Sequence, residues 1–229
     1  MTFSSNIDYI NNHFEFPILT KIHGHPDYEQ LKQIKDELRA NATSVTANLG
    51  GGAHGHLGLV LDDIEYTFVS PTAYVRPLHP GVSVIPPGTP NWQAQMLRED
   101  HKEAIRLFNE ITNIEKALLK QLGKALPDLY LKQFRNSHSN TITTNLPTIL
   151  EFLFTTYGDI EQEHLDEKKE QLCAKVFDIT QPMAVMFNEV EDLLKLSTAA
   201  ANPYTPRQVI KIAEQLIKNF NDFEKGLEE

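Results

Sequence analysis

Cysteine is almost missing from this chain. The single cysteine among 229 residues, Cys173, has no second cysteine with which to form an internal disulfide. A zinc site built from several cysteines is excluded for the same reason. Such low cysteine usage is typical of proteins from a reducing compartment.

Long apolar runs are missing too. No stretch reaches the roughly 20 residues that a transmembrane helix needs, and residues 1–4 lack the basic-then-apolar form of a signal peptide. With 41% hydrophobic and 23% charged residues, the composition is ordinary for a folded globule, and the length suits one large domain or two small ones. We therefore expect a soluble, cytoplasmic protein with no membrane partner.

Basic residues are outnumbered by acidic ones, and the net charge is −10. Residues 1–145 carry 13 basic and 15 acidic side chains, whereas residues 146–229 carry 8 and 16. The acidic excess therefore lies mainly in the C-terminal part. Because an acidic surface repels phosphate groups, the composition predicts a poor nucleic-acid binder.

The sequence also lacks the motifs of common catalytic sites. It contains no Gly-x-Ser-x-Gly elbow, no His-Glu-x-x-His pair and no dinucleotide-binding glycine fingerprint. Cys173 follows Leu172 in a helical pattern, which indicates a buried small side chain rather than a nucleophile. The carboxylates between Glu161 and Glu170 are spaced like those of a solvated helix face. We therefore expect neither an enzyme nor a bound cofactor.

Two histidine pairs leave a metal site as an open alternative. His54 and His56 lie in residues 49–61 (LGGGAHGHLGLVL), and His23 and His25 form a second pair. The four could bind zinc together, although two His-x-His pairs do not by themselves make a closed, oriented set of ligands. Three consecutive glycines permit backbone conformations that other residues avoid, so we favour a tight turn and predict no metal site. The glycines also lack the Gly-Lys-Ser/Thr ending of a phosphate loop.

Helical periodicity and end signals predict a mostly α-helical fold, because apolar residues recur at three- and four-residue steps in several stretches. The predicted helices cover residues 28–42, 91–121, 146–157, 161–176, 180–197 and 205–223. The second of these is either one long helix or two with a break in the middle. Asp27 is expected to cap the first helix, and Thr205 and Gln208 to form a capping box at the last. Gly158 is expected to end a helix in the left-handed conformation.

Two stretches lack helical periodicity. Prolines interrupt residues 70–89, which predicts a long loop that covers a surface or reaches a partner. Residues 136–144 are polar and have no periodic apolar face, so we expect a linker between domains there.

Six segments carry a family resemblance when they are taken in order. They are residues 40–61 (ANATSVTANLGGGAHGHLGLVL), 86–105 (PPGTPNWQAQMLREDHKEAI), 146–160 (LPTILEFLFTTYGDI), 166–172 (DEKKEQL), 177–194 (FDITQPMAVMFNEVEDLL) and 205–217 (TPRQVIKIAEQLI). Together they resemble the capsid part of Gag-like polyproteins of copia-type LTR retrotransposons. The retroviral major homology pattern of Gln, Glu, Phe and Arg is not found, so kinship with retroviral capsids would be at the level of fold.

The resemblance implies an all-α, retroviral-capsid-like fold of two small helical domains, with a Gly/Pro-rich irregular region in the N-terminal half. We expect an N-terminal domain at residues 1–135, a linker at 136–144 and a C-terminal domain at 145–229. The implied function is self-assembly with other copies into a capsid-like shell, with RNA packaged by a segment outside this chain. The alternatives are a helical adaptor that does not assemble, a domesticated Gag-derived protein, or a protein whose four histidines bind a metal.

The candidate contacts between copies come from two patterns. In the helix at 180–197, two apolar positions fall away from the main apolar stripe, and exposed apolar side chains commonly mark an interface. In the helix at 91–121, three basic residues spaced by four form a face that is either solvated or in contact with an acidic neighbour. The candidate contact residues are Val185, Leu196, Arg98, Lys102 and Arg106.

Overall fold

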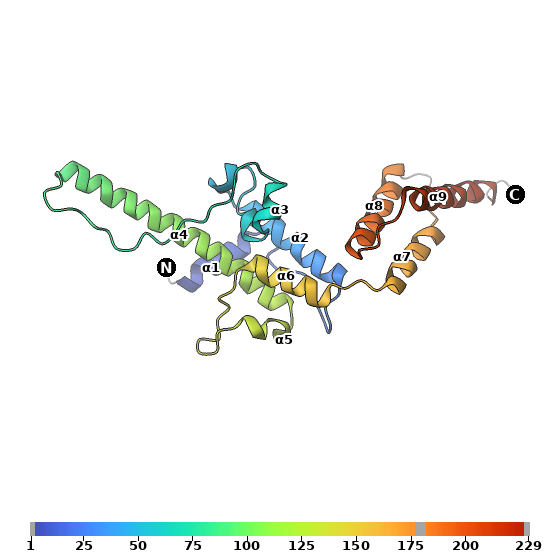
Figure 1. The fold of residues 1–229 in the computed structure, drawn as a ribbon, viewed down its shortest axis with the longest axis horizontal. Helices are drawn as coiled ribbons and strands as arrows, with labels where there is room; N and C mark the ends of the chain where they lie inside the picture. The colour runs from blue at the N-terminus through green and yellow to red at the C-terminus, as the bar shows by residue number, and fades with distance from the viewer. Residues whose placement is uncertain (1–2, 177–181, 227–229) are drawn as a thin grey trace. The chain divides into compact units, whose positions relative to one another are not determined.

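The computed structural model describes residues 3–176 and 182–226, and these confirm the predicted all-α class. Within these ranges there is no β-strand, apart from an isolated antiparallel bridge between Arg135 and Ile142. The α-helices are α1 (Phe3–His13), α2 (Tyr28–Ser44), α3 (Asp63–Thr67), α4 (Asn91–Ala125), α5 (Asp128–Leu131), α6 (Leu146–Tyr157), α7 (Gln162–Ala174), α8 (Met183–Ala199) and α9 (Pro206–Gly226) (Figure 1). Contacts between residues divide the chain into two compact units, a first unit at Met1–Gly158 and a second unit at Asp159–Glu229.

The core of the first unit is formed by α2, the C-terminal half of α4, and α6. The fully buried side chains of these helices include Leu31, Ile34, Leu38, Ile114, Leu118, Leu122, Leu146, Ile149 and Leu153. On each helix they recur at three- and four-residue steps, so each helix turns one apolar face inward. The predicted cap of α2 by Asp27 is confirmed, because its carboxylate accepts a hydrogen bond from the Gln30 N–H at 2.8 Å. The Gln30 side chain also accepts one from the Asp27 N–H, which completes a capping box.

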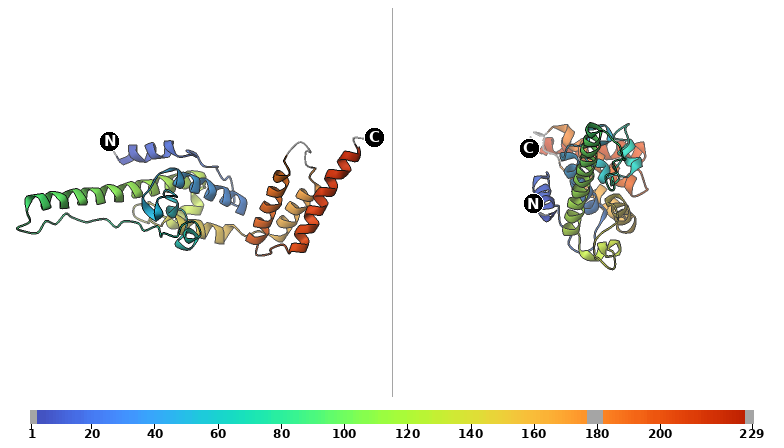
Figure 2. Two further views of the ribbon diagram at one scale, coloured as in Figure 1. Left: turned by 90° about the horizontal axis from the view of Figure 1, so that it is seen from above. Right: turned by 90° about the vertical axis from the view of Figure 1, so that its left-hand side faces the viewer.

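Helix α4 is one unbroken helix of 35 residues, which at 1.5 Å per residue is roughly 50 Å long. Its two halves have different surroundings. The C-terminal half lies in the core, where Ile114 and Leu118 are almost completely buried. The N-terminal half is accompanied by the proline-rich segment that leads into it (Figure 2).

Buried polar side chains tie the segment between α1 and α2 to the core. The Asn41 amide accepts a hydrogen bond from the Phe16 N–H at 2.7 Å and donates one to the Phe16 carbonyl at 2.9 Å. The Gln121 side chain joins this group by accepting from Asn41 at 2.9 Å. The Glu37 carboxylate accepts from both the N–H and the hydroxyl of Thr20, at 2.8 and 2.6 Å. These bonds satisfy polar groups that helix packing removes from water.

The division into units differs from the predicted one. Helix α6 was expected in the C-terminal domain, after a linker at residues 136–144. Instead, Leu146, Leu150 and Leu153 of α6 lie in the same hydrophobic cluster as the core residues of α2 and α4, and α6 contacts both helices. The polar residues 136–144 are therefore a surface loop within the first unit, and the division falls after Gly158.

Gly158 ends α6 as predicted, but not in the left-handed conformation. Its φ angle is −90°, and its N–H donates to the Phe154 carbonyl at 2.9 Å. A Cβ atom at this position would lie 2.6 Å from that same carbonyl oxygen. Glycine is therefore favoured here because the backbone approaches closely, not because φ is positive.

The second unit is a bundle in which α7 packs against both α8 and α9. Its buried side chains include Leu165, Leu172, Met186, Val190, Leu193, Leu196, Ile212 and Leu216. The predicted capping box of α9 is confirmed, since the Thr205 N–H donates to the Gln208 side chain at 2.8 Å and the Gln208 N–H reaches the Thr205 hydroxyl at 3.4 Å. The predicted start of α8 at Thr180 lies outside the described residues.

Within the described ranges, no helix combines the length and the apolar character that crossing a bilayer requires.

Candidate functional site

The glycine-rich segment at residues 49–61 folds over a small buried polar cluster. Gly50 has a φ angle of +58°, and its carbonyl accepts hydrogen bonds from the Ser70 hydroxyl at 2.9 Å and the Tyr66 hydroxyl at 3.2 Å. A Cβ atom on Gly50 would lie 2.1 Å from the Tyr66 hydroxyl oxygen. The glycine therefore allows both the turn and the close approach of the tyrosine ring.

His56 is part of this cluster and is 98% buried, with 2% of its surface exposed. Its Nδ1 lies 2.8 Å from the Tyr74 hydroxyl, and its backbone N–H donates to the Ala42 carbonyl at 2.8 Å. Its Nε2 has no hydrogen-bond partner among the described residues. The segment is thus a tight turn, as favoured from the sequence, but it places His56 in the core rather than at the surface.

The four histidines do not form a metal site in the described part of the chain. His25 lies against the rings of Tyr130 and Tyr157, at centroid distances of 6.0 and 5.3 Å, whereas His56 contacts Tyr74. Across residues 3–176 and 182–226, no group of three or more His, Cys, Asp or Glu side chains is placed to hold a metal ion. The structure therefore gives no support to the zinc alternative.

Burial lowers the pKa of His56 below its ordinary value of 6.5, and the carboxylate of Glu110 raises it by less. The folded protein therefore favours the neutral imidazole. Since the unfolded chain takes up a proton near pH 6.5, stability should be highest above that pH and should fall as the pH drops below it. Burial also raises the pKa of the neighbouring Tyr74 hydroxyl, which stays protonated throughout this range.

We predict that His56→Gln flattens this loss of stability, because glutamine keeps hydrogen-bonding groups but does not titrate. The measurement is the free energy of unfolding in urea between pH 7.5 and 5.5. His138→Gln, at an exposed position, is the control and should keep the wild-type slope. Equal slopes for wild type and His56→Gln would show that His56 does not control the pH dependence.

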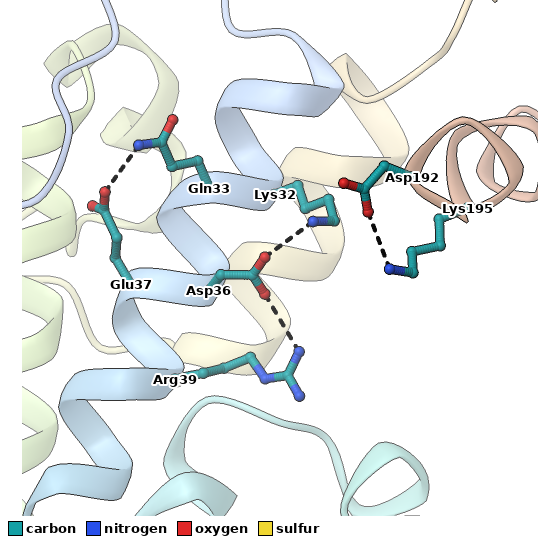
Figure 3. A network of polar contacts seen from close by, with 7 residues as sticks. All are labelled: Lys32, Gln33, Asp36, Glu37, Arg39, Asp192 and Lys195. Carbon is teal, nitrogen blue, oxygen red and sulfur yellow. Dashed lines mark hydrogen bonds and ion pairs between the residues drawn. The ribbon is translucent and has the colours of Figure 1, made fainter. Parts of the chain in front are cut away.

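A groove of about 390 Å³ lies between α2, α3 and α6. Each of its three cations forms an ion pair. Lys32 and Arg39 both pair with Asp36, at 3.1 and 3.4 Å (Figure 3). Lys35 pairs with Glu65 at 2.6 Å. The lining also includes the carboxylates of Asp62 and Glu151, so the groove carries three cations and four carboxylates and has no excess of positive charge that would select an anion.

The predicted contact residues of α8 are only partly exposed. Leu196 has 8% of its surface exposed and Val185 is half-buried, so the prediction that Leu196 points away from the core is wrong. The buried face of α8 is centred on Leu193, which turns Leu196 inward. The exposed apolar side chains of α8 are Met183 and Phe187, at 58% and 50%.

The predicted basic face of α4 is exposed, but one of its members is neutralised within the helix. Arg106 forms ion pairs with Glu103 and Glu110, at 2.8 and 2.7 Å, one turn away on either side. Arg98 and Lys102 are exposed. Exposed ion pairs within one helix contribute little to the free energy of folding. They leave Arg106 on a solvated face of the helix, which agrees with the interpretation that needs no acidic neighbour.

Sequence reasoning missed a group of exposed apolar side chains in the first unit. They are distributed along the chain from α3 to the first turn of α4, and each is at least 69% exposed: Ile64, Phe68, Val75, Leu78, Val82, Val84 and Trp92. A signal was present, because residues 77–97 contain no Lys, Arg, Asp or Glu. Exposure of several large apolar side chains along one segment is typical of an interaction surface.

Comparison of the chain with protein family models, with curated proteins and with solved structures finds no match.

Proposed function

We propose that this chain is a structural protein that associates with copies of itself to build a capsid-like shell. The observation that carries the proposal is the exposure of large apolar side chains on both compact units. The first unit exposes the group between α3 and α4, and the second exposes Met183 and Phe187 on α8 with Ile210 and Ile217 on α9. Burial against another copy would remove this surface from water.

Two separate units suit such an assembly. A subunit with a self-association surface on each unit can make two kinds of contact at once, which extends an assembly beyond a dimer. The capsid resemblance of the sequence supports the same function. We do not propose that these residues bind RNA, because the net charge of −10 opposes it.

The proposal is tested by sedimentation velocity over a range of protein and salt concentrations. Because the chain is acidic, copies repel one another at low ionic strength. Added salt screens this repulsion, and at 0.1 M charges more than about 10 Å apart hardly interact. We expect larger species to appear with rising protein concentration, and at lower protein concentration when salt is added. A chain that remains monomeric under all conditions would favour the helical adaptor instead.

A substitution on α8 tests the second unit in this role. Phe187→Asp places a charge on a half-exposed apolar position, and we expect at least a tenfold weaker association, because an interface would have to bury that charge. Asn188→Asp adds the same charge at the neighbouring exposed position and serves as the matched control. If the two variants associate equally, Phe187 does not lie at a contact between copies.

A further inference from the structure

The proline-rich segment before α4 places one side chain in the core of the first unit. Of residues 71–90, all of which the structure describes, Tyr74 alone is buried. Its ring lies directly on Gly58, where an added Cβ atom would come within 2.3 Å of the tyrosine Cγ, and its centroid is 5.7 Å from that of the Tyr66 ring. Its hydroxyl lies 2.8 Å from Nδ1 of His56. Tyr74 therefore covers the buried histidine.

Few other interactions hold this segment in place. Within the described part of the chain, no backbone–backbone hydrogen bond involves residues 73–85. The Arg76 guanidinium forms a partly exposed ion pair with Glu115 at 2.8 Å, and the exposed His79 ring meets the Phe108 ring at a centroid distance of 4.9 Å. Ion pairs that water reaches contribute little to stability. Displacement of Tyr74 therefore breaks few further interactions.

His56 itself is fixed from the side opposite Tyr74. Its backbone N–H donates to the Ala42 carbonyl of α2 at 2.8 Å. A Cβ atom on the preceding Gly55 would lie 2.4 Å from the Val45 carbonyl oxygen, so the turn is tightly packed against the end of α2. A change at His56 is therefore met more easily by movement of Tyr74 than by movement of the turn.

Protonation is a change that this site does not accommodate. A neutral imidazole carries a proton on one nitrogen, whereas the charged ring carries one on both. Nε2 of His56 has no hydrogen-bond partner among the described residues. The charged ring would thus bury a positive charge and an N–H without an acceptor, which is costly in the interior of a protein.

Groups on the neighbouring elements do not offset this cost. The charged or titratable side chains that face the His56–Tyr74 pair are Tyr66 of α3, Glu110 and Glu115 of α4, and Arg76 of the segment itself. The Glu110 carboxylate and the Thr46 backbone favour the charged imidazole, but burial outweighs both and lowers the pKa of His56. Protonation of His56 is therefore linked to its exposure to water.

We propose that His56 and Tyr74 form an acid-sensitive latch, in which protonation of His56 releases Tyr74 and the segment around it while the core of the first unit stays folded. The inference is independent of the proposed self-assembly. Once Tyr74 has left, water reaches the imidazole and hydrates its charge. In this released form His56 takes up a proton near its ordinary pKa of 6.5, so the latched form is favoured above that pH and the released form gains population below it.

The expected size of the effect follows from this linkage. With a pKa of about 6.5 in the released form and a neutral ring in the latched form, the ratio of released to latched molecules rises about tenfold between pH 7.5 and pH 5.5. The measurement is NMR relaxation dispersion of the tyrosine ring signals at low salt, which gives the population of the minor form. The Tyr74 signals are assigned by their absence from Tyr74→Phe.

Two histidine variants test the latch. His56→Gln cannot titrate, and we expect its ratio to change by less than twofold over the same pH range. His79→Gln, at the exposed histidine of the same segment, is the matched control and should keep the tenfold rise. A tenfold rise that persists in His56→Gln would overturn the latch. So would an unchanged ratio in the wild type, a result that requires no variant to fold.

Methyl signals of the core separate local release from unfolding of the whole unit. Leu31 of α2 and Leu122 of α4 are completely buried. We expect their methyl groups to show no exchange at the rate found for Tyr74. If they exchange at the same rate, acid opens the core as a whole, and the proposal of a local latch is overturned.

Discussion

Replacing Gly55 with alanine should strongly destabilise the first unit, and more than the same change at Gly24. Gly55 has a φ angle of +52°, and an added Cβ would lie 2.4 Å from the Val45 carbonyl oxygen, 2.6 Å from that of Thr43 and 2.9 Å from that of Ala42. All three atoms belong to the backbone at the end of α2, so none can rotate away. Left-handed strain costs about 1–2 kcal/mol and overpacking about 1–3 kcal/mol, so we expect a loss of roughly 2–5 kcal/mol in the free energy of unfolding.

Urea denaturation of Gly55→Ala and Gly24→Ala checks this prediction. Gly24 also has a positive φ angle, +90°, but no atom lies within 4 Å of its added Cβ. The control therefore carries only the backbone strain, about 1–2 kcal/mol. A difference of less than 1 kcal/mol between the two variants would contradict the close packing of the glycine-rich turn against α2.

Leu153→Ala should destabilise the first unit and leave the second unchanged. Leu153 is completely buried in the cluster formed with α2 and α4, and removal of a buried leucine side chain costs about 2–5 kcal/mol. Thr156→Ala, at an exposed position on the same helix, is the control and should change stability by less than about 0.5 kcal/mol.

Hydrogen exchange resolved along the chain separates the two units in this experiment. We expect faster exchange in α2, α4 and α6 of the Leu153→Ala protein, with unchanged rates in α7 and α8. If α7 and α8 lose protection while α2 keeps it, α6 belongs with the second unit and the division after Gly158 is wrong.

Local patterns predicted most of the helices, because caps and apolar spacing act within a few residues. The caps at Asp27 and Thr205 are examples, since each joins residues that are three positions apart. The boundary between units could not be predicted in this way. A polar loop such as residues 136–144 shows that helices end there, but not whether the next helix packs with the preceding ones or the following ones.

Local patterns also could not predict which residues of the candidate sites meet in space. The contact between His56 and Tyr74 joins residues 18 positions apart, across a turn whose path no local pattern describes. On α8, the buried face lies about one residue away from the position predicted by the apolar spacing. As a result Leu196 is buried and Phe187 is exposed, the reverse of the prediction. Periodicity identified the amphipathic helix, but the packing of α7 and α9 set its orientation.

Electron microscopy of the purified chain tests the central claim most directly. The protein is concentrated in low salt and in high salt, and both samples are imaged after sedimentation has identified the assembled fractions. The account predicts closed, curved particles of limited size range, more abundant in high salt. Monomers or small fixed oligomers in both samples would contradict it.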